Sequence, residues 1–242
     1  MVEPLFRFDG SVSVGAIINL DGPEGHHAAS VRRMRIGEAI QLTNGLETHS
    51  RGVVVAVSPK SLEIRIDSVE QLVRPALSFG LVQALAKGDR DELAIQAATE
   101  LGVSRITPWQ AERSVSRWDA VKSTKGVERW TTITAEAAKQ ATRALFPVVL
   151  EPVTSKTLAG RMNENFLILD PTAKMSIVDW SPPAEGYIEL VVGPEGGISE
   201  HELELFESSG ALRVHLGEGI LRTSTAGMAA LAFLAGRNGL WG

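Results

Sequence analysis

The sequence predicts an α/β protein with two domains, a β-rich domain over residues 1–72 and a larger α/β domain over residues 73–242. Three observations lead to this fold class. The 242 residues are 44% hydrophobic and 22% charged, a balance typical of a globular chain long enough for more than one domain. The N-terminal third alternates polar and apolar side chains between turns, as strands do. After Pro75, short apolar runs alternate with helix patterns, which is typical of a parallel sheet.

The N-terminal domain is predicted to be a small β-barrel or open sheet with one short helix. Asn44-Gly45 is a strong hairpin signal, because both residues tolerate positive φ. Pro75 marks the boundary, since proline restricts the residue before it. The expected strands cover residues 11–20, 39–43, 52–57 and 61–66, and the expected helix covers residues 26–34.

The C-terminal domain is predicted to be a mainly parallel sheet with helices on both faces. Ser199 and Glu202 fit a capping box at the start of one helix, and Gly102 and Pro147 fit helix ends. The expected strands cover residues 77–84, 106–109, 166–169, 188–192 and 213–216. The expected helices cover residues 89–101, 121–143, 199–209 and 223–235.

The ends of three expected strands carry unusual residues. Asp170-Pro171 follows one strand, a loop with three glycines at 193–197 follows another, and Gly217-Glu218-Gly219 follows the last. In open α/β sheets ligands bind beyond the carboxyl ends of the strands. The loops fit neither a phosphate loop, which needs Gly-Lys-Ser/Thr, nor a dinucleotide fingerprint. A small-molecule site and plain structural turns both remain open from these residues alone.

Composition excludes several classes of protein. The chain has no cysteine, which removes disulfides, thiol nucleophiles and iron–sulfur clusters. Its five histidines show no metal spacing, so we expect no metal. The apolar stretch at 226–235 is too short for a bilayer, and the N-terminus does not read as a secretory signal. We therefore expect a cytoplasmic protein without membrane contact.

Positive charge is concentrated in one part of an acidic chain. The net charge is −5, yet residues 105–143 carry eight Lys and Arg against four Asp and Glu. Such a basic surface can hold a polyanion, although solvated helix faces explain the same pattern. The tryptophans in this stretch either stack on bases or belong to the core. They are Trp109, Trp118 and Trp130.

Several motifs together resemble the ribosomal RNA small subunit methyltransferase E family, a branch of the SPOUT-type RNA methyltransferases. The resemblance covers nearly the whole chain and keeps the order of the motifs. It is carried by His26-His27 with residues 31–45, Lys87-Gly88-Asp89 with 96–103, 112–115, 129–140, 192–197 and 216–226.

This resemblance implies a fold, a reaction and partners. The fold would be a PUA-like N-terminal β-barrel domain joined to a C-terminal α/β-knot domain with a trefoil-knotted, mainly parallel sheet. Family members are homodimers that use S-adenosylmethionine to methylate N3 of a uridine in the decoding region of 16S ribosomal RNA. The expected partners are therefore 16S rRNA within the small ribosomal subunit and a second copy of the chain. The small residues at 226–235 suit a dimer contact or close packing on the sheet.

The resemblance also assigns a cofactor pocket, held largely by backbone groups. Its expected residues are Leu169, Gly193, Glu195, Gly196, Gly197, Leu216, Gly217, Ile220, Leu221 and Thr225.

Catalytic roles follow from the chemistry of methylating uridine N3, which must lose its proton. Arg222 cannot lose its charge, so it is expected to stabilise a developing uridine anion or to grip a phosphate. Glu195 is either a base or a structural acceptor of backbone N–H groups, with the structural role favoured. Arg143 is expected to orient the target. The expected RNA-binding residues are Arg32, Arg33, Arg35, Lys87, Arg113, Arg129, Gln140 and Arg143.

The sequence departs from the family pattern at a few positions. Gly219 replaces a usually basic residue, Ser224 a usually acidic one, and Ala97 a common lysine. These changes concern RNA contacts more than the glycine loops. They keep open an alternative function, a non-catalytic RNA-binding ribosome assembly factor on a SPOUT-like scaffold.

Overall fold

The computed structural model describes residues 3–239 and divides into two compact units. The first unit runs to Arg74 and also includes residues 138–146, and the second holds residues 75–137 and the chain from Pro147 onward. The sequence-based domains, 1–72 and 73–242, differ from these units in the segment 138–146. The domain boundaries themselves stay a prediction.

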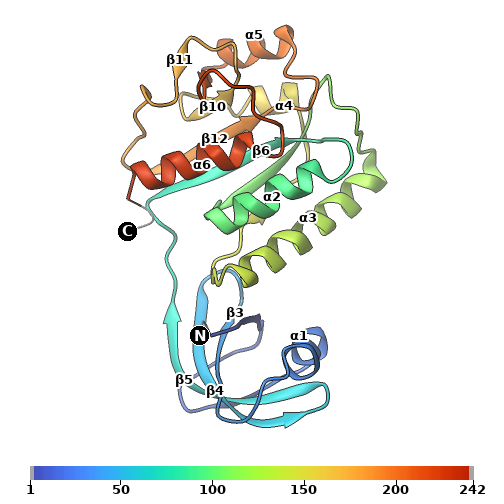
Figure 1. Ribbon diagram of the computed structural model, residues 1–242, viewed down its shortest axis with the longest axis vertical. Coiled ribbons are helices and arrows are strands. Elements are labelled where there is room, and N and C mark those ends of the chain that lie inside the picture. The colour runs from blue at the N-terminus through green and yellow to red at the C-terminus, as the bar shows by residue number, and fades with distance from the viewer. Residues whose placement is uncertain (1–2, 240–242) are drawn as a thin grey trace. The chain divides into compact units, whose positions relative to one another are not determined.

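The first unit is built on a five-stranded sheet (Figure 1). Its strand order is β1-β3-β4-β5-β2, with β1 parallel to β3 and the other neighbours antiparallel. A short helix and a π-helical turn follow β2 where the sequence predicts one helix. The elements are β1 (Leu5–Arg7), β2 (Ile17–Leu20), α1 (Gly22–His26), η1 (His27–Val31), β3 (Ala39–Thr43), β4 (Thr48–Ser58) and β5 (Ser61–Gln71).

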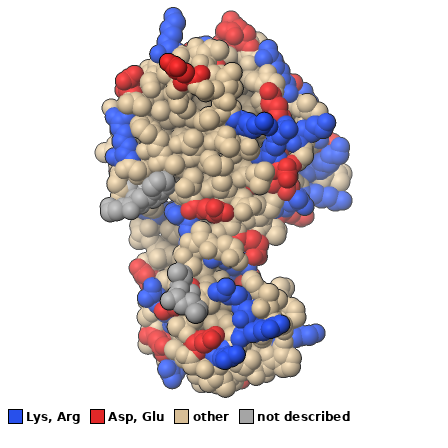
Figure 2. Space-filling view, viewed as in Figure 1, with Lys and Arg blue, Asp and Glu red and all other residues tan. Residues whose placement is uncertain are grey.

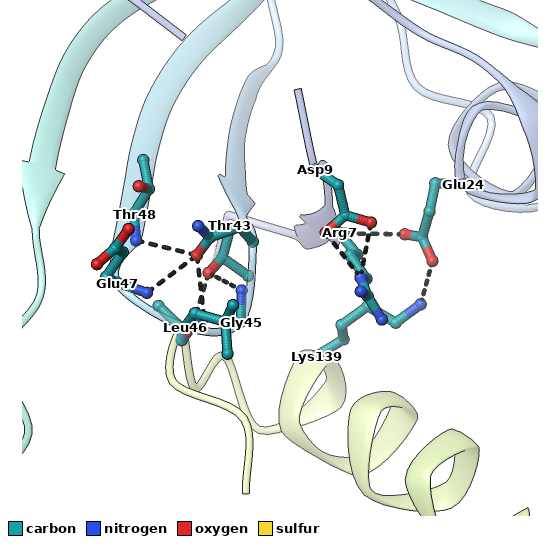
Figure 3. A network of polar contacts seen from close by, with 11 residues as sticks. Arg7, Asp9, Glu24, Thr43, Gly45, Leu46, Glu47, Thr48 and Lys139 are labelled. Carbon is teal, nitrogen blue, oxygen red and sulfur yellow. Dashed lines mark hydrogen bonds and ion pairs between the residues drawn. The ribbon is translucent and has the colours of Figure 1, made fainter. Parts of the chain in front are cut away.

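Alternation of side chains fixes the core of this unit. Along β5, Leu62, Ile64 and Ile66 are fully buried while the residues between them are exposed, as the two-residue period of a strand requires. The predicted hairpin lies between β3 and β4. Asn44 Oδ1 accepts the backbone N–H groups of Leu46, Glu47 and Thr48 at 2.9–3.0 Å, which closes the turn (Figure 3).

The segment 138–146 joins this unit through backbone and side-chain bonds. The Thr43 hydroxyl donates to Ala144 O at 2.6 Å, and Phe146 N–H donates to Gly45 O at 2.8 Å. Gly45 has φ +77°, and a Cβ there would meet the Phe146 ring at 2.6 Å, so glycine is required by both conformation and space. The predicted helix 121–143 ends at Gln140, which frees these residues to pack on the first unit.

The second unit is an α/β unit with a sheet of eight strands, all paired in parallel (Figure 1). The order is β11-β13-β10-β12-β6-β7-β8, and β9 also pairs with β7. The strands are β6 (Leu77–Ala84), β7 (Arg105–Gln110), β8 (Val148–Val149), β9 (Val153–Thr154), β10 (Phe166–Leu169), β11 (Met175–Ser176), β12 (Gly186–Val192) and β13 (Leu212–His215). The helices are α2 (Arg90–Leu101), α3 (Ala120–Gln140), α4 (Ser155–Ala159), α5 (Glu200–Ser208) and α6 (Ala226–Arg237).

Two hydrophobic clusters lie on opposite faces of this sheet. Leu81 and Leu190 point into a cluster with α2 and α6, while their neighbours Val82 and Val191 point into one with α4 and α5. Gly227 lets α6 lie directly on the sheet, since a Cβ there would approach Leu81 to 2.8 Å. The α/β fold class with helices on both faces is therefore confirmed, and the knot in the chain stays a prediction.

The buried tryptophans belong to the core. Trp109 and Trp130 are almost fully buried, and Trp118 packs edge-on against Trp130 with ring centroids 5.4 Å apart. The sequence left two interpretations of the tryptophans open, base stacking and core packing. Core packing accounts for Trp109 and Trp130.

A buried ion pair joins β12 to β7 across the strand between them, β6, inside the second unit. Glu189 is 3% exposed and pairs with Arg105, whose guanidinium also lies over the Tyr187 ring. Burial raises the pKa of the Glu189 carboxyl, and Arg105 opposes that effect. Gly80 stands opposite Glu189 in the sheet and leaves room for its carboxylate.

None of the helices in residues 3–239 combines the length and the apolar character needed to cross a membrane. Over the same residues, no group of three or more His, Asp and Glu side chains is placed to hold a metal ion.

Candidate functional site

Three neighbouring parallel strands end at the same edge of the sheet. β13, β10 and β12 are adjacent, and they lead into Leu216, Asp170 and the loop 193–197. A cavity of about 40 Å³ lies at the ends of β10 and β13. Its walls are Leu169, Asp170, Pro171, Val214, Leu216, Gly219, Leu221 and Ala226. Three of the predicted cofactor residues, Leu169, Leu216 and Leu221, thus share one cavity.

Glu195 ties the loop 193–197 to the start of α2. Its carboxylate accepts the Lys87 backbone N–H at 2.9 Å and the Arg90 guanidinium at 2.8 Å. Desolvation raises the pKa of the Glu195 carboxyl, but the backbone N–H groups of Glu195 and Lys87 and the Arg90 guanidinium outweigh it, so the pKa is lowered. A carboxylate in this state is a weak proton acceptor, which favours the structural role over the catalytic one.

Arg113 holds the same loop from another side. Its guanidinium donates to Gly196 O at 3.1 Å and to Ile198 O at 3.4 Å. Gly193 is in close contact with Ile198, which a Cβ would approach to 2.6 Å, and Gly197 has φ +72°. The glycines are therefore needed for the shape of the loop itself. Arg113, predicted to bind RNA, is engaged in the loop through this guanidinium.

A hydrogen-bonded chain that the sequence did not predict joins the two glycine loops. Gln83, at the end of β6, is fully buried and donates from Nε2 to the Thr223 hydroxyl at 2.9 Å. Thr223 in turn donates to Gly193 O at 2.8 Å. No local signal marks Gln83 and Thr223, because they are 140 residues apart and each is an ordinary polar residue.

The loop 217–222 is open toward solvent. Gly217 has φ +115°, and a Cβ at Gly217 or Gly219 would meet nothing within 4 Å. Ile220 is 82% exposed, although it is a large apolar residue. Arg222 is also exposed, and its carbonyl accepts the Ala226 N–H at 2.9 Å. Its guanidinium therefore extends from a fixed backbone at the start of α6.

Asp170 places a charged group on the wall of the cavity. Arg213 donates to Asp170 Oδ2 from Nε at 2.9 Å and from a terminal nitrogen at 2.5 Å. Desolvation raises the pKa of the Asp170 carboxyl, but hydrogen bonds from Thr172 and Arg213 prevail and lower it. The carboxylate is thus charged and neutralised by its partner.

The other predicted RNA-binding residues separate into two groups. In the second unit, Lys87 is exposed and the Arg129 guanidinium is bound by Glu92 of α2. Figure 2 shows Lys and Arg side chains gathered over the region of α3 with acidic residues among them, so the predicted basic surface is present but partly neutralised. In the first unit, Arg32, Arg33, Arg35 and Gln140 are exposed and Arg143 is half-buried.

Comparisons with known proteins place the chain in a family. A family model described as an RNA methyltransferase domain matches residues 74–235, and one described as an RNA methyltransferase PUA domain matches residues 20–67. The ribosomal RNA small subunit methyltransferase E of Mycobacterium bovis is 39% identical over all of this chain and 94% of its own length. The chain belongs to the ribosomal RNA small subunit methyltransferase E family. The family member of Bacillus subtilis is 31% identical, with 90% of this chain and 89% of that protein covered.

A solved family structure has the same fold. The ribosomal RNA small subunit methyltransferase E from Neisseria gonorrhoeae, bound to S-adenosyl methionine, superposes with a TM-score of 0.87 at 28% identity and covers 98% of both chains. The resemblance stated from the motifs is confirmed, and so is the PUA-like character of the N-terminal domain.

Proposed function

We propose that this chain is an S-adenosylmethionine-dependent methyltransferase that acts on N3 of a uridine in the decoding region of 16S ribosomal RNA. The observation that carries the proposal is the adjacency of three strand ends at one sheet edge, where Thr223 ties the segment after Gly217 to Gly193, in a chain of this family. The family relatives are named for small subunit rRNA, and the relative from Neisseria gonorrhoeae binds S-adenosyl methionine.

The residues at the sheet edge are of the kind that such a ligand needs, and the ligand would extend from the cavity of about 40 Å³ over the open loop 217–222. Leu169, Leu216 and Leu221 offer apolar walls, and Gly217 and Gly219 leave open space where a side chain would stand. Backbone groups of the loops 193–197 and 217–221 are accordingly the proposed contacts for the remaining parts of the ligand. When bound, S-adenosylmethionine supplies an electrophilic methyl group.

The chain's own residues orient the target and manage charge. As uridine N3 loses its proton, negative charge spreads onto O2 and O4 of the base. Arg222 is exposed and follows the cavity-lining residue Leu221 in the chain, so we assign its guanidinium the stabilisation of that charge. Arg143 is assigned to RNA positioning. Glu195 is assigned to holding the loop, because its carboxylate is already paired.

Calorimetry with S-adenosylmethionine tests ligand binding first. One site per chain is expected, and the absence of heat from folded protein contradicts the proposal. A tritium-transfer assay from labelled S-adenosylmethionine to isolated small ribosomal subunits then tests the reaction, with free rRNA as comparison. RNA binding without any transfer would favour the non-catalytic assembly factor, which the departures at Gly219 and Ser224 keep in view.

Replacing Arg222 separates catalysis from ligand binding. Arg222→Ala is expected to lower transfer by about a hundredfold or more, the scale of losing one oxyanion-stabilising group, and to leave S-adenosylmethionine affinity within a few-fold. Arg161→Ala, at another exposed arginine of the second unit, is the matched control and should keep full transfer. Unchanged activity in Arg222→Ala removes its catalytic role.

The proposed homodimer requires a separate measurement. In the described chain, Gly227, Ala230 and Ala235 of α6 are buried within the second unit, so these small residues already serve close packing on the sheet. Light scattering that gives twice the mass of one 26.0 kDa chain supports the dimer, and a single-chain mass at micromolar concentration contradicts it.

A further inference from the structure

A second cavity lies entirely within the first unit. Its volume is about 220 Å³, which is below the ~300 Å³ where pockets for drug-sized ligands begin and suits one ring system with its substituents. The walls come from β1, from η1 and the residue after it, and from the segment 138–146. The lining residues are Glu3, Pro4, Leu5, Phe6, His27, Arg32, Lys139, Gln140 and Thr142.

A buried ion pair fixes the wall of the cavity that the segment 138–146 forms. Lys139 is 7% exposed, and its ammonium pairs with the Glu24 carboxylate (Figure 3). The other Glu24 oxygen accepts the Arg7 backbone N–H at 3.1 Å, so one carboxylate joins β1 to the segment 138–146. Breaking a buried pair is costly, because one charge is left without its partner. The two walls are therefore fixed relative to each other before any ligand binds.

The backbone next to this pair is strained on both sides of the cavity. Among the described residues, Arg33 and Thr142 are the non-glycine positions with positive φ, at +55° and +52°. Left-handed backbone is unfavourable for residues that carry a Cβ. Thr142 lines the cavity and Arg33 follows the lining residue Arg32. Strain held at two places around one cavity is typical of a binding site.

The floor of the cavity offers hydrogen-bonding groups and aromatic surface. The Arg7 N–H points away from β3 and donates to Glu24. Backbone groups of residues two apart in a strand point to the same side, so the N–H and C=O of Leu5 also point away from β3. The Phe6 ring is 2% exposed and packs edge to face against His27 with centroids 5.7 Å apart, so the half-buried His27 ring is the aromatic surface at the cavity. A planar base can stack on His27 and pair its edge with main-chain groups.

The cavity has two charged parts, an acidic one at Glu3 and a basic one at Arg32. Glu3 Oε2 is buried and accepts no hydrogen bond from the described residues, and the Arg51 Nε lies 3.7 Å away. Arg32 and Gln140 are exposed at the cavity, with Arg33 next along the chain. A ligand that suits both parts presents N–H donors at one end and negative charge at the other. A free phosphate meets only the second condition, whereas a nucleotide meets both.

We infer that this cavity binds one unpaired base of an RNA strand. The base offers an amino or imino N–H to the Glu3 carboxylate, and the adjoining phosphate lies on Arg32 and Gln140. The inference rests on the proposed action on RNA, and it adds a site in the first unit that the cofactor loops do not contain. The site is composite, since residues 139–142 complete a surface begun more than a hundred residues earlier.

Anisotropy of a fluorescent single-stranded RNA of about eight nucleotides tests the site in the full chain. Arg32→Gln and Gln140→Ala are each expected to weaken binding about tenfold, the loss of one hydrogen bond to a charged group. Arg65→Gln removes the same charge from an exposed position on β5 and should change the affinity less than twofold. Equal losses in Arg32→Gln and Arg65→Gln would mean diffuse electrostatic attraction and would overturn the inference.

Photo-crosslinking of the wild-type chain gives a test that needs no variant. RNA with 4-thiouridine should cross-link to peptides that contain residues 3–8, 27–35 or 139–143, and cross-links confined to other peptides contradict the site. RNA affinity and methyl transfer together distinguish the cavity inference from the methyltransferase proposal. If Arg32→Gln keeps full RNA affinity and the wild type transfers methyl groups, the cavity inference fails alone. If RNA affinity falls as expected but the wild type transfers nothing, the methyltransferase proposal fails alone.

Discussion

The hydrogen-bonded chain between the glycine loops predicts a large effect from removing a single oxygen atom. Thr223→Val replaces the hydroxyl by a methyl group of similar size. Thr223 is 7% exposed, accepts from Gln83 Nε2 at 2.9 Å and donates to Gly193 O at 2.8 Å. The substitution removes both bonds and leaves the Gly193 carbonyl without this donor.

The structure sets the size of the expected effect. Two hydrogen bonds contribute about 1 kcal/mol each, and the half-buried Gly193 carbonyl left without its donor adds up to about as much again, so Thr223→Val should lower the free energy of unfolding by about 2–3 kcal/mol. Because the lost bond fixes the loop 193–197, affinity for S-adenosylmethionine should fall by about tenfold.

Urea unfolding and calorimetry measure these two quantities. The matched control is Thr131→Val on α3, where the hydroxyl donates to Val127 O at 2.8 Å but the residue is exposed, and its effect should stay within about 0.5 kcal/mol. If Thr223→Val is no more destabilising than Thr131→Val, the chain of hydrogen bonds does not stabilise the loops. If it destabilises but leaves ligand affinity intact, the bonds serve the fold alone.

The remaining predictions concern a buried ion pair and a surface one. Gly80→Ala places a Cβ in the space of the Glu189 carboxylate and should lower the free energy of unfolding, measured in urea, by about 3 kcal/mol. Gly160→Ala, at φ −65° with ordinary contacts, is the control and should lower it little. Equal effects of the two substitutions would contradict the steric argument. Hydrogen bonding and charge from Glu112 raise the pKa of His201, so Glu112→Gln should lower that pKa in an NMR titration. The stabilisation of the fold by the His201–Glu112 pair is complete below the unfolded pKa of histidine and is lost as pH rises through the folded pKa of His201. A pKa of His201 that Glu112→Gln leaves unaltered would refute this assignment.

Local patterns predicted the elements that depend on local signals. The capping box at Ser199 and Glu202 is present with both of its hydrogen bonds, because its residues are three apart and need no distant partner. The expected strand 11–20 is shorter, since it begins only at Ile17 after Gly15 with φ +85°. In place of the expected helix 26–34, a short helix over Gly22–His26 is followed by a π-helical turn over His27–Val31, so the helical segment begins and ends earlier than predicted. Periodicity does not distinguish such turns from a regular helix.

Long-range contacts could not be predicted in the same way. Glu195 reaches the backbone of Lys87, and Gln83 reaches Thr223, through distances in sequence that no motif encodes. The strand-end rule placed the glycine loops at one edge correctly, because it depends only on strand direction. The partners that hold those loops became visible only with the fold. The same holds for Lys139, which packs with the first unit through Glu24.

Nucleoside mass spectrometry of ribosomal RNA from cells that lack this chain measures the proposed modification itself. We expect N3-methyluridine to disappear from the decoding region of the small subunit rRNA. Wild-type chain should restore it, and the Arg222→Ala variant should not. Full N3-methyluridine at that position in cells without the chain would mean that another enzyme makes it and would refute the proposed function.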